Sequence, residues 1–65
     1  MLIRVNGEEY DVVAETTIEK LLQILNKKGT LVVSLNQTVC PKSQHPQTEL
    51  KNGDTLDIIS IIGGG

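Results

Sequence analysis

The stretch ETTIEKLLQILNKKG, residues 15–29, carries the helical pattern around which the rest of the chain is organised. Four apolar residues recur at the i, i+3, i+4, i+7 spacing of one helical face: Ile18, Leu21, Leu22 and Leu25. Thr16 and Glu19 stand at capping-box spacing, which predicts that they close the first turn. The pair Lys27-Lys28 lies where the helix dipole favours cations, and Gly29 supplies a left-handed stop. We therefore expect one amphipathic helix, whose lysines serve its end rather than a binding patch.

Before this helix, the segment MLIRVNGEEYDVV has the pattern of a β-hairpin. Apolar residues alternate on both sides of Asn6-Gly7, a dipeptide that offers the positive backbone angles of a two-residue turn. Strands are expected near residues 1–5 and 9–13.

After the helix, β-rich runs alternate with turns and one loop. Five segments are expected, in chain order: a strand at 30–35, a short edge strand at 38–40, a surface loop at 41–47, a turn at 51–54 and a last strand at 55–62. A helical crossover after a hairpin allows a later strand to lie parallel to an earlier one. The expected fold class is α+β, a mixed sheet of four or five strands with the helix on one face and the last strand in the centre.

Alternation along the last strand places isoleucine side chains on a face that no second helix covers. If Leu56 and Ile58 face the helix, Ile59 and Ile61 point to the opposite face, and Val32 extends that face. Two interpretations stay open. Either a kink in the register buries one isoleucine, or the face is a patch that docks a partner.

Composition and charge argue against two classes of partner. The net charge is −2 and Tyr10 is the only aromatic residue, so the chain lacks a basic surface for phosphates and stacking rings for bases. No apolar run approaches the roughly 20 residues of a membrane span, and no secretory pattern opens the chain. We expect neither nucleic acid nor a membrane as a partner.

Cys40 is the only cysteine and His45 the only histidine. One cysteine forms no internal disulfide, which fits a reducing, cytoplasmic location. No partner base is evident for a nucleophilic thiol, so Cys40 is interpreted as a half-buried structural residue. One cysteine and one histidine fall short of the ligands of a zinc site, and no metal site is expected.

The run Gly63-Gly64-Gly65 follows β-branched residues, although glycine disfavours strands and loses the most entropy on ordering. A frayed end or an added scar is one interpretation. The other is a flexible tail at 63–65, beyond a folded domain at 1–62, that carries a carboxylate into a partner's channel. A carboxylate is a poor electrophile, so adenylation by ATP would activate it toward sulfur or nitrogen nucleophiles. The partner would bind the nucleotide, because the chain has no P-loop or dinucleotide-binding motif.

Five features together resemble the ThiS family of thiamine-pathway sulfur carriers: the Asn6-Gly7 hairpin, the threonine-capped helix, SLNQTVCPKSQ (34–44), NGDTLDII (52–59) and the IIGGG ending. The likeness spans the whole chain and implies a ubiquitin-like β-grasp fold. It also implies a protein cosubstrate rather than an enzyme. The related small subunit of molybdopterin synthase typically has a proline pair shortly before its diglycine, where this chain has Ser60-Ile61-Ile62. The resemblance therefore favours the thiamine branch.

The same resemblance implies a series of partners. A ThiF-type adenylyltransferase would use ATP and magnesium to adenylate Gly65, and a sulfur relay such as a cysteine desulfurase would supply the sulfur of a thiocarboxylate. Thiazole synthase would accept that sulfur. Gly65 is then the acyl carrier and Gly64 its required neighbour, with no cofactor bound by this chain. The residues expected to contact these partners are Gly63, Ile59, Ile61 and Ile62.

Three alternatives stay open. The tail would serve equally well in a carrier for molybdopterin or another thio-metabolite, because the tail chemistry is shared. It would also suit a ubiquitin-like modifier that is conjugated to lysines through Gly65. A plain binding module would use the face of Ile59 and Ile61 and leave the tail inert.

Overall fold

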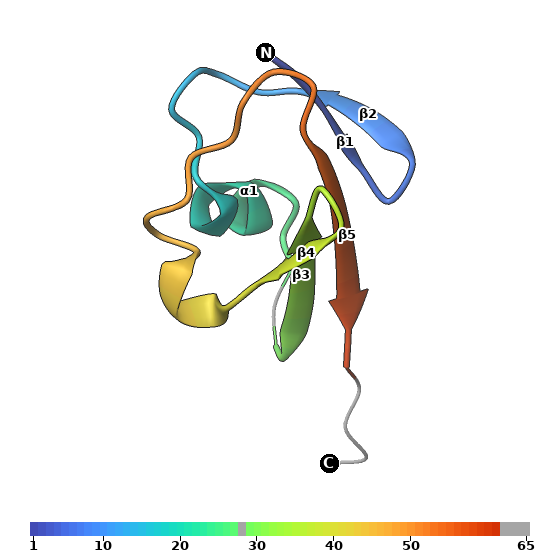
Figure 1. Ribbon diagram of the computed structural model, residues 1–65, viewed down its shortest axis with the longest axis vertical. Helices are drawn as coiled ribbons and strands as arrows, with labels where there is room; N and C mark the ends of the chain where they lie inside the picture. Colours follow the sequence, from blue (N-terminus) through green and yellow to red (C-terminus); the bar gives the residue numbers. More distant parts are fainter. Residues whose placement is uncertain (28, 62–65) are drawn as a thin grey trace.

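A five-stranded mixed sheet with one α-helix on one face forms the body of the molecule (Figure 1). The computed structural model describes residues 1–27 and 29–61, so Lys28 and residues 62–65 lie outside the described residues. The strands are, in chain order, β1 (Leu2–Val5), β2 (Glu8–Asp11), β3 (Leu31–Leu35), β4 (Thr38–Cys40) and β5 (Thr55–Ser60). The helix α1 spans Ile18–Ile24, and a 3-10 turn, η1, spans Lys42–Gln44. The predicted α+β class and the edge strand at 38–40 are confirmed.

The strands lie side by side in the order β2-β1-β5-β3-β4, so the last strand is the central one, as predicted. β5 runs parallel to β1, with Val5 opposite Leu56, and antiparallel to β3, with Val33 opposite Ile58. Parallel neighbours need a long crossover, which the helix and the segments after it provide. β5, the last strand in the sequence, is therefore hydrogen-bonded to a neighbouring strand on each side.

One face of the sheet and the inner face of α1 enclose the hydrophobic core. The buried apolar residues of the described chain are Ile3, Val5, Val12, Ile18, Leu21, Val33, Leu50, Leu56 and Ile58. Leu22 and Leu25 pack against this cluster and are half-buried, which confirms the predicted helix face. In such a small domain these aliphatic side chains supply most of the folding free energy, because apolar burial is the dominant favourable term.

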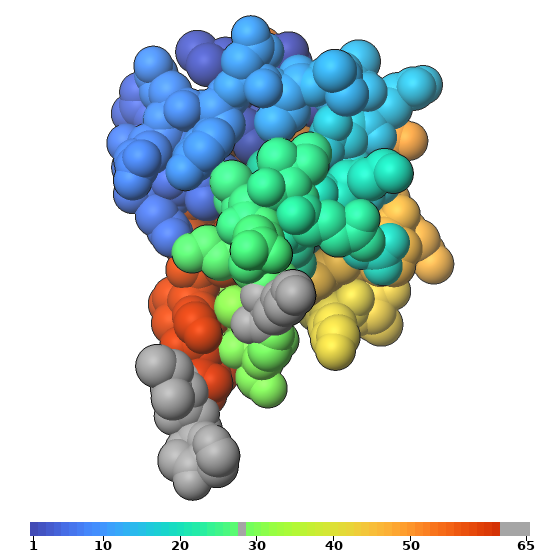
Figure 2. Space-filling view, turned by 180° about the vertical axis from the view of Figure 1, so that it is seen from behind, coloured from blue at the N-terminus to red at the C-terminus, as the bar shows by residue number. Residues whose placement is uncertain are grey.

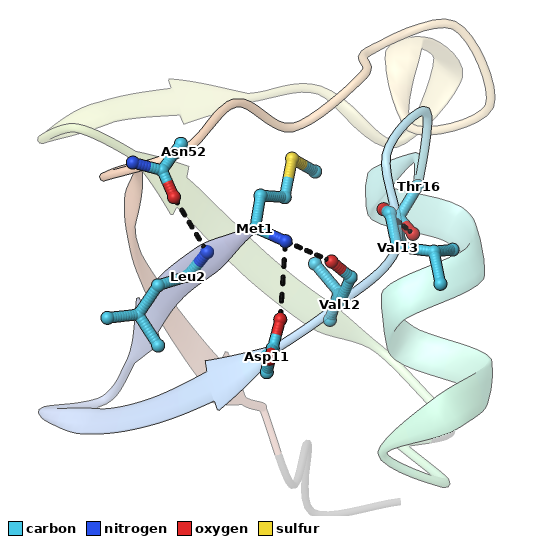
Figure 3. Close-up of polar contacts among 7 residues, drawn as sticks. All are labelled: Met1, Leu2, Asp11, Val12, Val13, Thr16 and Asn52. Atoms are coloured by element: carbon cyan, nitrogen blue, oxygen red, sulfur yellow. Dashed lines mark hydrogen bonds and ion pairs between the residues drawn. The ribbon is translucent and has the colours of Figure 1, made fainter.

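The helix begins one residue later than its sequence pattern indicates. Thr17 is the N-cap, and its hydroxyl accepts a hydrogen bond from the Lys20 amide at 3.2 Å. Thr16 is buried instead, and its hydroxyl donates to the Val13 carbonyl at 2.7 Å (Figure 3). The predicted capping box is therefore wrong. Its physical cause is long-range pairing, since the Leu50 amide donates to the Thr16 carbonyl at 2.8 Å and holds that residue in the core.

The helix also ends earlier than predicted. Asn26 adopts a left-handed conformation with φ +58°, and its amide donates to the Gln23 carbonyl at 3.1 Å. The Lys27 amide donates to the Leu22 carbonyl at 2.9 Å, which completes a Schellman motif. Asparagine tolerates this conformation almost as glycine does. Gly29 is therefore not the stop, and Lys27 lies beyond the helix rather than in its last turn.

The start of β1 is tied to the segments beside it. The Met1 amine donates to the Val12 carbonyl at 2.6 Å and to an Asp11 carboxylate oxygen at 3.2 Å (Figure 3). The Leu2 amide donates to the Asn52 side chain at 2.8 Å. β2 ends at Asp11 rather than at residue 13, yet Val12 remains in the core. These contacts join the first hairpin to the turn that precedes β5.

The segment predicted as a surface loop at 41–47 is partly an element of the core. It contains η1, and the His45 side chain is only 6% exposed. The Nε2 atom of His45 lies 3.1 Å from the Cys40 carbonyl, and a carbonyl only accepts, so Nε2 carries the proton that is donated. The His45 carbonyl accepts from the Glu19 amide at 3.2 Å. Because His45 joins β4 to α1, the prediction from composition alone is wrong at this residue.

The turn between β3 and β4 contains a strained residue. Asn36 has φ +51° and Gln37 has φ +72°, as a type I′ turn requires at both central positions. An L-residue with a Cβ pays roughly 1–2 kcal/mol for a left-handed conformation, whereas glycine does not. We expect Gln37→Gly to raise the free energy of unfolding by about 1 kcal/mol, measured by equilibrium urea denaturation.

The matched control for this prediction is Gln47→Gly. Gln47 is exposed like Gln37 but is not among the residues with positive φ, so glycine there only adds chain entropy to the unfolded state. This control is expected to lose stability. A loss of stability in Gln37→Gly as well would show that strain in the turn is not the deciding term.

Candidate functional site

The end of β5 is the point at which the described part of the central strand stops. The Ile61 amide donates to the Thr30 carbonyl at 2.9 Å, so pairing with the segment of β3 continues to the last described residue. The arrow of β5 points toward the end of the molecule opposite to the N-terminus (Figure 1). Figure 2 shows from behind that the red atoms of β5 emerge below the hairpin of β1 and β2. Residues 62–65 therefore follow, in the sequence, a residue whose backbone amide is hydrogen-bonded to the segment before β3.

A group of exposed aliphatic side chains lies on the sheet face that α1 does not cover. Ile59 is 59% exposed, Ile61 is 48% exposed and Val39 is 62% exposed. Val32 is half-buried and lies directly opposite Ile59 in the pairing of β3 with β5. We call these four residues the apolar patch. Clustered apolar side chains on an otherwise polar surface are typical of docking sites.

The predicted exposure of Ile59 and Ile61 is confirmed, and the alternative of a register kink is wrong. Leu56 and Ile58 are almost completely buried, and the pairing of β5 with β3 is regular from Leu56 to Ser60. No bulge turns either exposed isoleucine into the core.

Val39 is the member of the patch that sequence reasoning missed. It lies opposite Ser34 in the pairing of β4 with β3, one diagonal step from Val32. Cys40, the next residue, lies opposite Val33 on the core side and is half-buried. The sequence of residues 38–40 was sufficient to predict this exposure. In a strand, a core-facing Cys40 places the preceding side chain, Val39, on the opposite face.

Charged side chains border the patch. Asp57 lies two residues before Ile59 on the same face of β5, opposite Ser34. Farther along that face, Arg4 and Glu9 form an ion pair at 3.2 Å, and both side chains are more than half exposed. An exposed pair of this kind contributes little to stability. The face therefore offers an apolar centre with an acidic side.

The described residues show no cluster of metal-ligating side chains, and two depressions on their surface are small. Among residues 1–27 and 29–61 no group of histidine, cysteine, aspartate and glutamate side chains is placed to hold a metal ion. Two depressions on the surface have volumes of about 280 and 200 Å³. Both are smaller than the roughly 300–1,000 Å³ of typical small-molecule sites. In the part of the chain that the structure describes, no helix has the length and apolarity needed to cross a membrane.

The structure thus brings together part of the predicted site. Ile59 and Ile61 lie next to one another on the exposed face, at the end of the central strand. The other predicted site residues, Ile62, Gly63, Gly64 and Gly65, lie outside the described residues.

Comparison with known proteins identifies relatives over the whole chain. The family model of the ThiS family matches residues 3–65. The crystal structure of the thiamine biosynthesis protein ThiS from Geobacter metallireducens is similar with a TM-score of 0.83 and 30% identity, over 100% of both chains. The Ycf40 protein of Pyropia yezoensis is 33% identical over 97% of this chain and 90% of its own length.

A further relative is much longer than this chain. A thiazole synthase of Paramagnetospirillum magneticum is 39% identical over 66 aligned positions, which cover 100% of this chain. This chain spans only 20% of the length of that protein. The similarity therefore concerns one segment of the longer protein.

Proposed function

The chain belongs to the ThiS family, and from this premise we propose that it is a sulfur carrier for thiazole formation in thiamine biosynthesis. The proposed carrier group is the Gly65 carboxylate, which is adenylated and then converted to a thiocarboxylate. In this role the chain is a protein cosubstrate rather than an enzyme. ATP and magnesium are bound by the activating partner, a ThiF-type adenylyltransferase.

The observation that carries the proposal is the relation between β5 and the glycines that follow it. β5 is the central strand, and its hydrogen-bonding continues one residue beyond it to Ile61. Gly63-Gly64-Gly65 begins two residues after Ile61, the last described position. Glycine has no Cβ, so such residues fit a narrow channel and leave the acyl carbon open to attack. The folded domain then serves as a handle for its own carboxylate.

The chemistry requires two steps at one carbon atom. An oxygen of the Gly65 carboxylate attacks the α-phosphorus of ATP, and pyrophosphate leaves. A sulfur nucleophile from the sulfur relay then attacks the acyl carbon, and AMP leaves with the original carboxylate oxygen. If that nucleophile is the terminal sulfur of a persulfide on the relay, the product is an acyl disulfide. A thiol reductant then attacks the donor's sulfur and forms a disulfide with it, and the S–S bond breaks with its electron pair on the carrier's sulfur. The net change at Gly65 is the exchange of one oxygen atom for one sulfur atom.

The apolar patch is the proposed docking surface for the activating and accepting partners. Its exposed isoleucines lie at the end of β5 from which the sequence continues to Gly65, so we expect a partner that binds the patch to receive the tail as well. Aliphatic side chains exposed to this extent lose unfavourable contact with water when a partner covers them. The longer thiazole synthase relative supports such an enzyme as the sulfur acceptor, because one polypeptide there includes a segment similar to this whole chain.

The direct test is sulfur loading followed by intact-protein mass spectrometry. The purified chain is incubated with its ThiF-type adenylyltransferase, ATP, magnesium, cysteine and a cysteine desulfurase. The expected result is a mass increase equal to one sulfur atom minus one oxygen atom, dependent on ATP. An unchanged mass contradicts the proposal. Adducts that join Gly65 to lysines of other proteins would indicate a protein modifier instead.

A further inference from the structure

The side chain of Asn6 is bound to the central strand by both ends of its amide. The Asn6 Oδ1 atom accepts from the Ile58 amide at 2.8 Å, and Asn6 Nδ2 donates to the Ile58 carbonyl at 3.2 Å. The Asn6 backbone amide also donates to the Leu56 carbonyl at 2.9 Å. A side-chain amide has the same donor and acceptor groups as a peptide. Asn6 therefore extends the ladder of β1 by one step after β1 itself has turned away.

This contact lies beside Ile58, at a point where β1 no longer pairs with β5. β1 ends at Val5, and Asn6 enters the turn with φ +51°. Within the described chain, Asn6 is the last residue on the β1 side that hydrogen-bonds to β5. On the opposite side, pairing continues to Ile61 through Thr30. Without the Asn6 amide, the second half of β5 would be held along one edge only.

We propose that Asn6 is a positioning residue for the carrier reaction, which holds the second half of β5 in the direction from which a partner receives the chain end. This inference rests on the proposed function. A strand end fixed before binding loses less conformational freedom when the partner engages it. The Asn6 amide supplies that fixation at Ile58, three residues before the last described residue.

The chain contains a matched residue for comparison, Asn36. It has the same φ of +51° at the same position of the other hairpin turn. Its Oδ1 atom accepts from the Thr55 amide at 3.0 Å, and its Nδ2 atom donates to an Asp54 carboxylate oxygen at 3.1 Å. Asn36 therefore holds the first residue of β5, whereas Asn6 holds the second half of the strand. The two side chains therefore bind different positions of one strand, Thr55 at its start and Ile58 in its second half.

The test compares Asn6→Gly with Asn36→Gly. Glycine accepts the positive φ of both turns, so each substitution removes the side-chain amide and keeps the turn. Adenylation is followed by ATP–pyrophosphate exchange, with the carrier protein as the varied substrate. We expect Asn6→Gly to raise KM by about tenfold and to leave kcat within about twofold of the original. The reason is that the freed half of β5 must lose conformational freedom when the partner binds. Asn36→Gly is expected to keep both constants within about twofold.

The comparison separates positioning from stability. Both variants lose hydrogen bonds to β5, so both are expected to unfold at a lower urea concentration than the original chain. A KM that rises equally in both variants, or in neither, overturns the role of Asn6. If the original chain is not adenylated at all, the proposed function fails and this inference fails with it. An active original chain with an unaffected Asn6→Gly variant overturns only the inference.

Asn6→Asp provides a second variant if Asn6→Gly does not fold. Aspartate also accepts a left-handed conformation and has the same shape as asparagine. It retains an acceptor for the Ile58 amide but places a charged oxygen, without a donor, against the Ile58 carbonyl. The same rise in KM is expected for this variant. An unchanged KM for Asn6→Asp would contradict the inference independently of the glycine series.

Discussion

Removal of Gly65 is expected to abolish sulfur loading and to leave the fold unchanged. Truncation shortens the chain by about 3.3 Å, while catalysis requires reacting atoms within roughly 3–3.5 Å of one another. The new carboxylate at Gly64 would therefore stop short of the nucleotide in a partner site built for the full length. We expect the rate of loading to fall by at least about 100-fold. The core consists of residues from Ile3 to Ile58, so the urea midpoint should not change.

The measurement for the truncated chain is the intact mass after a loading reaction in parallel with the full-length protein. Gly65→Ala serves as the control, because it keeps the length and adds only a methyl group beside the acyl carbon. This control is expected to be loaded more slowly than the original chain but faster than the truncated one. Equal loading of the truncated and full-length chains would show that the carrier group is not at Gly65.

Ile59→Glu is expected to weaken docking to the adenylyltransferase by about 100-fold, which is the effect of removing a central interface residue. The substitution removes an exposed aliphatic side chain from the middle of the apolar patch and places a second carboxylate near Asp57. Its effect on stability should be small, about 1 kcal/mol, because it arises from strand propensity and not from the core. The readout is the KM of the carrier in ATP–pyrophosphate exchange.

Ile24→Glu is the matched control for this prediction. Ile24 is 62% exposed, close to the 59% of Ile59, but it lies on α1, away from the uncovered sheet face. Glutamate is a good helix former, so the domain should remain folded. A KM that is unchanged in Ile24→Glu and raised in Ile59→Glu assigns docking to the apolar patch. Similar values for the two variants would contradict that assignment.

The tail and the patch together also test the alternative of a plain binding module. Such a module would lose its partner when Ile59 is charged but would tolerate removal of residues 63–65. The carrier account predicts that both changes stop loading, the first by preventing docking and the second by removing the reactive group. The carrier account is supported if the original chain is loaded and a chain without residues 63–65 is bound by the adenylyltransferase but not loaded. An original chain that is bound and not loaded fits the plain binding module instead.

Local periodicity was sufficient to predict most of the fold. The spacing of Ile18 and Leu21 indicated the buried helix face, and alternation along β5 indicated the exposure of Ile59 and Ile61. Both patterns depend only on residues close in the sequence. The central position of β5 followed from the order of elements, because a helical crossover after a hairpin favours a parallel neighbour for β1.

The features that sequence reasoning missed depend on contacts between distant residues. The capping-box spacing favours Thr16 as the helix cap, but the hydrogen bond from the Leu50 amide holds Thr16 in the core, and Thr17 is the cap. The polar neighbours of His45 favour a surface loop, and only the folded chain brings the Cys40 carbonyl to its ring.

The second role of Asn6 was also hidden from the sequence. Asn6-Gly7 was identified as a hairpin turn, which is confirmed by the positive φ of both residues. The bonds of the Asn6 amide to Ile58 join residues 52 positions apart, and they form only because β1 and β5 are parallel neighbours. Local pattern therefore indicates the turn, while the positioning role requires the folded sheet.

The central claim is that the sulfur atom is carried on the acyl carbon of Gly65, and fragmentation of the loaded protein in the mass spectrometer tests it most directly. The account predicts that the oxygen-to-sulfur exchange is found in every fragment that contains Gly65 and in none that ends before it. A whole sulfur atom added to fragments that contain Cys40, with an unmodified Gly65, would contradict the account.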